Sequence, residues 1–164
     1  MGHTIIEKII GKNIGREVKP GDIVTVNVDR VMIHDIFIPF VKEKFEEMGF
    51  TKIWDPDKAV LIYDHLVPAS QVDDTRHFRI GNEFVEKYGM KNIHRSDGIC
   101  HQLMTEAGYV KPGDIAFGTD SHTTTYGCVG AFSSGIGYTE MASVLGTGKM
   151  GVKVPQTIKV TVNG

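Results

Sequence analysis

The chain has 164 residues, of which 41% are hydrophobic and 23% are charged, and its formal net charge at pH 7 is −2. This balance is typical of a globular α/β domain with one hydrophobic core. Acidic and basic residues are interspersed and form no basic stripe, so we do not expect nucleic acid as a partner. The sequence has no apolar run near the roughly 20 residues of a membrane span and no signal-peptide pattern. We therefore expect no membrane partner and a cytoplasmic location.

The amino-terminal residues predict a helix followed by a strand. Thr4 and Glu7 have the spacing of a capping box, and isoleucines then recur at helical intervals as far as Gly11, where we expect the helix to end. A Pro-Gly-Asp turn comes next. Residues 23–28 then alternate between apolar and polar side chains, which predicts a strand with one face in water.

The next part of the chain predicts two helices with a buried strand between them. Residues 29–35 are less regular. Pro39 stands in the first turn of an apolar-sided helix that Gly49 ends. The uninterrupted apolar run at 59–63 predicts a strand that is buried on both faces, as in a parallel sheet. A second amphipathic helix is expected at 72–88.

The remaining elements are shorter. Residues 92–94 are a weak strand candidate, 99–107 predict a short helix, and 115–117 predict a strand. The glycine-rich stretch 126–149 keeps its apolar residues on a rough helical stripe, so we expect a broken or tightly packed helix there. Residues 157–162 alternate like a new strand.

The alternation of strands and helices predicts an α/β fold, with three α/β/α layers and a mostly parallel sheet. We expect residues 1–150 to form this first α/β domain. The predicted last strand runs into Asn163-Gly164, a turn signal that ordinarily leads to a partner strand. We therefore expect residues 151–164 to be the start of a following, truncated segment.

An aspartate and a histidine follow two of the predicted strands. Asp64-His65 comes directly after the buried run, and Asp120 and His122 come just after the strand at 115–117. Ligands of open α/β sheets bind beyond the carboxyl ends of the strands, so two such pairs predict one shared active site. A carboxylate beside an imidazole orients the ring and favours its protonated form, which suits a proton donor. One such pair alone is more often a turn or capping feature, but two at strand ends favour catalysis.

The two cysteines, Cys100 and Cys128, are too few and too far apart for a disulfide framework or for a closed zinc or iron-sulfur site made by this chain alone. We expect both to be free thiols in the interior. No positive side chain closely flanks Cys100, so a buried thiol is favoured over a nucleophile.

Four motifs occur in one order along the chain: Asp64-His65, GICHQ at Gly98–Gln102, GTDSHTTTYG at Gly118–Gly127, and GTGK ending at Lys149. Together they resemble the aconitase superfamily, and most of all the amino-terminal part of the large subunit of 3-isopropylmalate dehydratase and homoaconitase. The resemblance implies the fold of the aconitase iron-sulfur domain. It also implies a hydro-lyase of branched-chain or lysine-type amino-acid biosynthesis, which reversibly dehydrates a hydroxy di- or tricarboxylate with the help of a [4Fe-4S] cluster.

The resemblance implies roles for individual residues. Asp64 and His65 are similar to the pair that gives a proton to the departing hydroxide, which is a poor leaving group without an acid. Asp120 and His122 are similar to the residues that hold iron-bound water and substrate. His101 resembles the histidine that pairs with the motif aspartate, so we expect His101 near Asp120.

Two further residues are expected to contact substrate by the same resemblance. Ser121 matches the motif serine and is expected to reach a substrate carboxylate, and His34 lies near a segment that contacts substrate in the family. Residues 124–126 differ from the Cys-Thr-His that often follows this motif. The substrate is therefore left open between isopropylmalate, homoaconitate and dimethylmalate types.

The resemblance also implies parts that lie outside this chain. The three cluster cysteines of the family come beyond residue 164, so we expect no metal ligands here and a [4Fe-4S] cluster only in a longer parent. The swivelling domain, which carries arginines and a serine base, is a separate small subunit in the two-subunit enzymes. We therefore expect the small subunit and a hydroxy acid as partners of the parent, and an inactive chain in isolation.

Two other functions remain open. The side chains of Asp64, His65, Asp120 and His122 are acceptable zinc or manganese ligands, so a divalent-metal hydrolase is one alternative. A non-catalytic scaffold is the other. Apolar faces left without their neighbouring domains would then lead to self-association or a domain swap.

Overall fold

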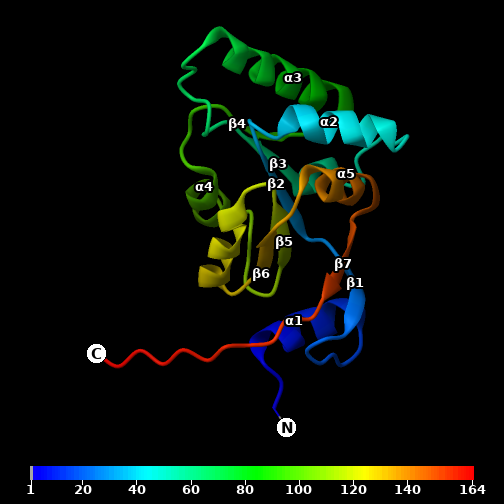
Figure 1. Cartoon of the computed structure of the whole chain (residues 1–164), viewed down its shortest axis with the longest axis vertical. Coiled ribbons are helices and arrows are strands. Elements are labelled where there is room, and N and C mark those ends of the chain that lie inside the picture. Colours follow the sequence, from blue (N-terminus) through cyan, green and yellow to red (C-terminus); the bar gives the residue numbers. More distant parts are fainter. Residues whose placement is uncertain (1) are drawn as a thin grey trace.

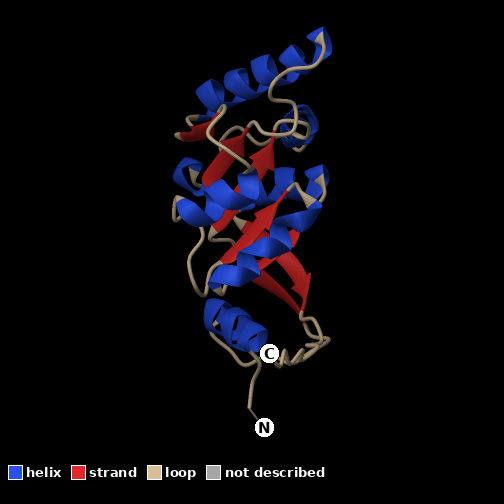
Figure 2. Cartoon of the chain, turned by 90° about the vertical axis from the view of Figure 1, so that its left-hand side faces the viewer, coloured by secondary structure: helices blue, strands red, loops and turns tan. Residues whose placement is uncertain are grey.

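The computed structural model describes residues 2–164, and its centre is a five-stranded parallel sheet with helices on both faces (Figures 1 and 2). The order of the strands is β4-β3-β2-β5-β6, and each neighbouring pair is parallel. The strands are β2 (Arg30–His34), β3 (Ala59–Ile62), β4 (Asn92–His94), β5 (Ile115–Gly118) and β6 (Phe132–Gly135). The predicted three-layer α/β/α fold is confirmed.

The side chains of the strands enter two separate hydrophobic cores because successive residues of a strand point to opposite faces. Val31 and Ile33 pack in the core that contains α2, α3 and α5, whereas Met32 between them packs in the core that contains α4. The helices are α2 (Ile38–Glu47), α3 (Val72–Tyr88), α4 (Cys100–Glu106) and α5 (Tyr138–Thr147). Burial on both faces explains why β3 reads as a continuous apolar run.

The chain changes direction across the sheet between β2 and β5. From β2 it moves outward through β3 to β4 on one side, and from β5 it moves to β6 on the other. The crevice beyond the carboxyl ends of strands at such a switch point is where α/β sheets bind ligands. The register places His34 beside Ile62 and Met32 beside Gly118, so β2, β3 and β5 end near one another.

An amino-terminal helix and a two-stranded ribbon lie near both ends of the chain (Figure 1). Helix α1 (Ile5–Ile14) packs on β1 (Ile23–Asn27), which pairs with β7 (Lys149–Lys153) in an antiparallel ribbon. The Thr4 capping box is present as predicted, but the helix continues past Gly11. It ends at Gly15, whose φ of 74° forms the left-handed cap that glycine favours. Gly11 lies inside the helix, and glycine suits this position because a Cβ there would meet the backbone oxygen of Arg16.

Two strands of the central sheet have no clear sequence pattern. Residues 29–35 contain β2, whose last four residues are all buried, so no alternation marks this central strand. The stretch 126–149 is not a broken helix. It contains the end of the 3₁₀ helix η2 (Ser121–Val129), then β6, then α5. Gly135 at the end of β6 permits close packing, since a Cβ there would collide with the backbone oxygen of Asp120.

The predicted strand at 157–162 is wrong. The last strand is β7, and the residues that follow it have no regular structure. Ile158, Val160 and Val162 are exposed, so their alternation is not matched by burial against a neighbour. Helix α3 and strand β4, by contrast, have the predicted bounds. Among the described residues, no helix is both long and apolar enough to cross a membrane.

Candidate active site

The side chains predicted to form one site lie together at the carboxyl ends of β2, β3 and β5. His34 ends β2, Asp64 and His65 follow β3, and the Asp-Ser-His segment follows β5. Helix α4 adds a histidine from its first turn. Ring contacts, hydrogen bonds and ion pairs connect the whole set, which is His34, Asp64, His65, His101, Asp120, Ser121 and His122.

Asp64 is held between its neighbour and helix α4. Its Oδ1 lies 2.7 Å from Nδ1 of His65, and its Oδ2 accepts a hydrogen bond of 2.7 Å from the backbone N–H of Cys100. Burial acts to raise the pKa of Asp64, but the Cys100 N–H and the His65 ring outweigh it and hold the pKa below its usual range. Asp64 is therefore an ionised orienting group for His65.

His65 lies among three carboxylates. In addition to Asp64, its Nδ1 is 4.0 Å from Oδ1 of Asp35, and its Nε2 is 3.4 Å from Oδ2 of Asp120. Burial favours the neutral ring, but these carboxylates, Asp64 first, outweigh it and raise the pKa of His65 above its usual value. About 31% of the side chain is exposed, so the ring is accessible to a substrate.

Asp120 is the centre of a second group of contacts, with His101 and His122. Its Oδ1 lies 2.8 Å from Nε2 of His101 and accepts a hydrogen bond of 2.7 Å from the backbone N–H of His122. The prediction that His101 lies near Asp120 is confirmed. Burial acts to raise the pKa of Asp120, but the His122 N–H and the His101 ring hold it below its usual range. The side chain of His122 is 80% exposed, and Oγ of Ser121 is 3.0 Å from its Nδ1.

His34 is buried between the two groups. Its Nδ1 lies 2.5 Å from Oγ1 of Thr119, and its ring stacks on Phe37 and meets the edge of His65 at 4.2 Å between ring centroids. Burial, followed by the nearby His65, lowers the pKa of His34 to about 4. The ring is therefore neutral at pH 7.

Asp35 is the main site residue that sequence reasoning missed. It is fully buried, and it accepts hydrogen bonds from the backbone N–H groups of Ile36, His65 and Leu66. Burial raises the pKa of its carboxyl group. Asp35 fixes the loop that carries His65. Its position directly after β2 is the signal that could have found it, but that strand has no recognisable sequence pattern.

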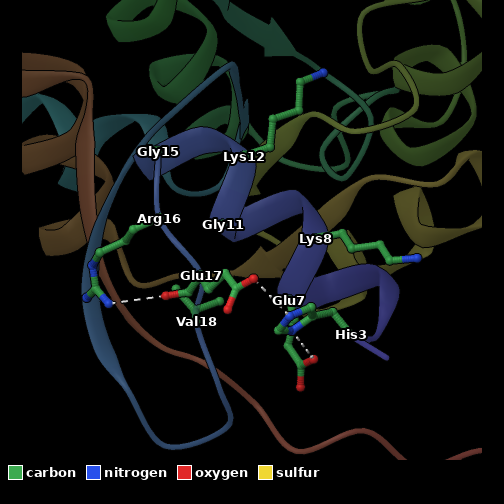
Figure 3. Close-up of a pocket in the computed structure, with 9 residues that line it drawn as sticks. All are labelled: His3, Glu7, Lys8, Gly11, Lys12, Gly15, Arg16, Glu17 and Val18. Atoms are coloured by element: carbon green, nitrogen blue, oxygen red, sulfur yellow. Dashed lines mark hydrogen bonds and ion pairs between the residues drawn. The ribbon is translucent and has the colours of Figure 1, made fainter. Parts of the chain in front are cut away.

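A groove borders the Asp120 side of the site. It has a volume of about 390 Å³ and lies between the ends of β5 and β6 and the start of α5; its lining is Phe37, Thr119, Asp120, Ser121, Ser134, Gly135, Ile136 and Gly137. A larger groove of about 440 Å³ lies beside α1, away from these strand ends, and is lined by side chains of both charges (Figure 3). Only the first groove adjoins the clustered aspartates and histidines.

The cysteines of this chain do not fit a [4Fe-4S] cluster. Cys100 is buried, and burial raises the pKa of its thiol, whereas a cluster ligand must be a thiolate. Cys128 is exposed, which corrects the expectation that both thiols are interior. Among the described residues, neither group of side chains with metal-ligand spacing contains a cysteine. The ligands of a cluster would therefore have to come from outside this chain.

The hydrolase ligand set suggested by the sequence is also not the one that the fold assembles. The side chains within reach of one ion are His34, His65 and Asp120 in one group, and Asp35, Asp64 and His65 in the other. His122 is in neither group. Its side chain is 80% exposed, and its Nδ1 lies 3.5 Å from Oδ1 of Asp120, which accepts the backbone N–H of the same residue.

Comparison with known proteins identifies the family. Residues 7–164 match the model of the aconitase family (aconitate hydratase). The chain belongs to the aconitase family. One relative, "3-isopropylmalate dehydratase large subunit 1" of Methanopyrus kandleri, is 45% identical over 165 aligned positions, which cover all of this chain and 40% of the relative.

Other aconitase-family relatives have similar names. "Probable 3-isopropylmalate dehydratase large subunit" of Methanothermobacter thermautotrophicus is 42% identical, and "3-isopropylmalate dehydratase large subunit" of Thermoanaerobacter pseudethanolicus is 40% identical. Each alignment covers all of this chain and 40% of the relative. The chain thus spans about two fifths of the length of these relatives.

Proposed function

We propose that this chain forms the acid/base part of a hydro-lyase that reversibly removes water from a hydroxy di- or tricarboxylate. The observation that carries the proposal is the position of the His65 ring, with Nδ1 against Asp64 and Nε2 facing Asp120 across 3.4 Å. A ring held in this way presents one nitrogen to a reacting group while a carboxylate stabilises its charge. The names of the relatives support the same reaction class.

The proton transfer follows from the chemistry of the leaving group. Hydroxide leaves poorly, so the substrate hydroxyl oxygen takes a proton from Nε2 of His65 as the carbon–oxygen bond breaks, and it departs as water. The imidazole becomes neutral, and its Nδ1 keeps a proton that it donates in a hydrogen bond to Asp64. The base that removes the proton from the neighbouring carbon is proposed to lie outside this chain, in a small-subunit partner.

Asp120 and the residues that hold it are proposed to position the substrate and the departing water. Asp120, held by His101 and by the His122 backbone, presents its Oδ2 toward His65 and can accept a hydrogen bond from the departing water. Ser121 and the groove beside it are proposed to receive a substrate carboxylate. The neutral ring of His34 restricts the space behind His65. We propose an isopropylmalate-type substrate from the names of the relatives, with homoaconitate and dimethylmalate as alternatives.

The test uses the complete enzyme that contains this chain, with its cluster and its small subunit, and compares the three candidate substrates. His65→Gln and Asp120→Ala should each lower kcat by about 10²- to 10⁴-fold, the usual range for the loss of a general acid or its partner. His3→Ala, at the far end of the molecule beside α1, is the control and should leave kcat unchanged. Near-normal turnover by both site variants would contradict the proposal.

A further inference from the structure

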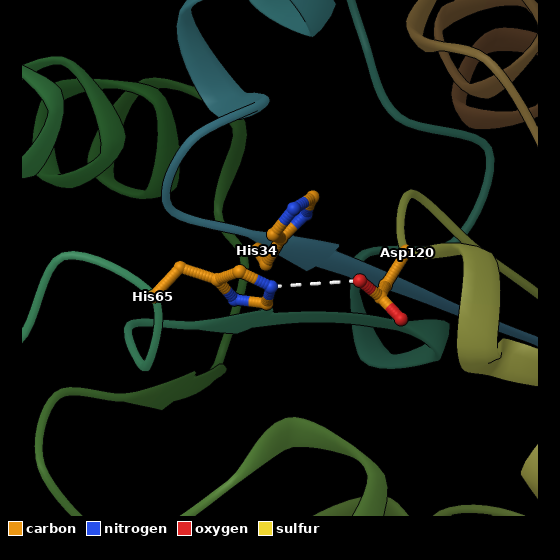
Figure 4. A group of neighbouring side chains, drawn as sticks. All are labelled: His34, His65 and Asp120. Carbon is orange, nitrogen blue, oxygen red and sulfur yellow. Dashed lines mark ion pairs between the residues drawn. The ribbon is translucent and has the colours of Figure 1, made fainter.

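A pocket with a volume of about 310 Å³ lies between helix α3 and the loop that follows β3. Its lining comes from this loop, from α3 and from the residue after β4, and consists of Tyr63, Val67, Ala69, Phe78, Asn82 and Arg95. The side chains of His34, His65 and Asp120 lie together at the active site (Figure 4), and none of them lines this pocket. Ligand pockets have volumes of about 300–1,000 Å³, so this one suits a small ligand.

The apolar wall of the pocket depends on a glycine of α3. Tyr63 is buried, and its ring meets the edge of the Phe78 ring with 5.2 Å between the ring centroids. Gly81 lies inside α3, where glycine is less favourable than alanine. A Cβ at Gly81 would collide with the Tyr63 hydroxyl, so the glycine lets this ring lie against the helix. Val67 and Ala69 add further apolar surface from the loop.

The polar side of the pocket is formed by Asn82 and Arg95. Nη2 of Arg95 donates a hydrogen bond of 3.0 Å to Oδ1 of Asn82, and the Tyr63 hydroxyl lies 3.4 Å from the same oxygen. Burial raises the pKa of Tyr63 to about 12, although the nearby Arg95 charge acts in the opposite direction, so this hydroxyl is neutral at pH 7. Within residues 2–164, Arg95 forms no ion pair with a carboxylate. Further N–H groups of its guanidinium are therefore left for a ligand.

The charge and the shape of the lining define the class of ligand. Arg95 is the only charged residue among the six that line the pocket, all of which belong to the described part of the chain. A guanidinium pairs with a carboxylate through two parallel N–H donors. We propose that this pocket binds a small monocarboxylate with an aliphatic side group, whose carboxylate pairs with Arg95 and whose side group packs on Phe78 and Val67.

This ligand is not the substrate of the proposed hydro-lyase, which carries a hydroxyl and two or three carboxylates. The pocket is therefore a second binding site. Val67 comes two residues after His65 in the same loop, so a bound ligand contacts the segment that carries the proposed acid without occupying any of its polar atoms.

The probe is 4-methylpentanoate, titrated into the complete 164-residue chain while the NMR signals of the Val67 and Ala69 methyl groups are followed. These signals should shift and saturate with a Kd of about 1 mM, which is ordinary for a ligand of about eight non-hydrogen atoms. Arg95→Gln should weaken binding by at least about tenfold, because it removes the charged donor. The uncharged 4-methylpentanamide should bind the unaltered chain more weakly by a similar factor. Circular dichroism establishes that the variant is folded.

Arg79→Gln is the matched control, since Arg79 is an exposed arginine of α3 that does not line the pocket. It should bind 4-methylpentanoate as the unaltered chain does. The proposal is overturned if no saturable shift occurs, if folded Arg95→Gln binds normally, or if the amide binds as tightly as the carboxylate. Largest shifts at Ser121 and Ile136, in the groove beside Asp120, would also overturn it. No turnover is measured, so these outcomes are distinguishable from a failure of the proposed hydro-lyase function.

Discussion

The two loops that carry an aspartate and a histidine use the same residue types differently. In the loop after β3, neighbouring Asp64 and His65 bind each other at 2.7 Å. In the loop after β5, the closest imidazole to Asp120 is His101 of α4 at 2.8 Å, while Nδ1 of His122 is 3.5 Å away. The first pair is therefore local, and the second depends on the packing of a helix. Similar motifs at two strand ends do not imply similar pairs.

The largest expected effect comes from breaking the local pair. Asp64→Asn keeps an oxygen for the Cys100 N–H but removes the charge beside His65, so the pKa of His65 should fall toward its usual value. In the complete enzyme, kcat should fall by about 10²- to 10⁴-fold. The pKa of His65 is measured by NMR titration of the ring in the 164-residue chain.

The control for this variant is another Asp-His pair of the same chain. Asp97 lies 2.7 Å from Nδ1 of His94, outside the site, so Asp97→Asn removes a comparable contact without touching His65. It should leave both kcat and the pKa of His65 unaltered. An unchanged His65 pKa in Asp64→Asn would show that the local pair does not govern this ring.

The next effect concerns His34, which lies between the two loops. Its pKa is lowered to about 4, so between pH 6.5 and 4 the unfolded chain binds a proton that the folded chain does not. The free energy of unfolding should therefore fall as the pH is lowered through this window, by about 3 kcal/mol from this ring alone. Urea unfolding at several pH values in this window measures the change in the free energy of unfolding.

His34→Gln is the comparison, because it removes the titrating ring and keeps a side chain that can bond to Thr119. Its unfolding free energy should depend less steeply on pH between 6.5 and 4. Asp64 and Asp120, whose pKa values are lowered, stabilise the fold above the usual carboxylate range, and this contribution is lost as the pH falls below about 4. If the unfolding free energies of the unaltered chain and of His34→Gln depended equally on pH above pH 4, the role assigned to His34 would be contradicted.

A smaller effect is expected when the second loop is pushed out of place. Gly135→Ala puts a Cβ against the backbone oxygen of Asp120, so it should lower the free energy of unfolding by about 1–3 kcal/mol and lengthen the contact between Asp120 and His101. Gly127→Ala, where nothing lies within 4 Å of the added Cβ, is the control and should change stability by less than about 0.5 kcal/mol. Equal stabilities of the two variants would exclude the close approach at Gly135.

The smallest effect sharpens the contrast within the second loop. His122→Ala removes an exposed ring and should alter the free energy of unfolding by less than about 0.5 kcal/mol. His101→Ala removes the hydrogen-bonding partner of Asp120 and should cost about 1–3 kcal/mol. Urea unfolding of both variants measures the difference in stability. A larger loss of stability in His122→Ala than in His101→Ala would show that His122, not His101, is the main partner of Asp120.

The elements that sequence patterns predict well are those with a local cause. Helix α3 has its predicted bounds because its apolar side recurs at helical spacing and Gly89 supplies a left-handed cap. Strand β2 was not predicted because it is buried on both faces and so has no alternation, and its apolar run between Arg30 and His34 is short. Strand β6 was not predicted because its glycine and serines carry no apolar pattern. The alternation at 157–162 predicts a strand, but a strand requires a partner as well as a pattern.

The same distinction holds for the site. The sequence located Asp64, His65 and the Asp-Ser-His segment, since each follows a recognisable strand. It did not reveal Asp35, whose importance comes from backbone N–H groups of a loop about thirty residues further on. It also assigned His122 rather than His34 to the alternative metal site, because only the packing of neighbouring strands determines which imidazoles share a space.

The sequence by itself determined the alternation of strands and helices, the caps, the turns and the residue types at the strand ends, because these depend on contacts within a few residues. Only the tertiary structure decided the strand order, the reversal between β2 and β5, and the partners of each carboxylate. Pairing of parallel strands and the docking of α4 join residues far apart in the chain. Their free energy comes from burial of complete faces, which no short window of sequence contains.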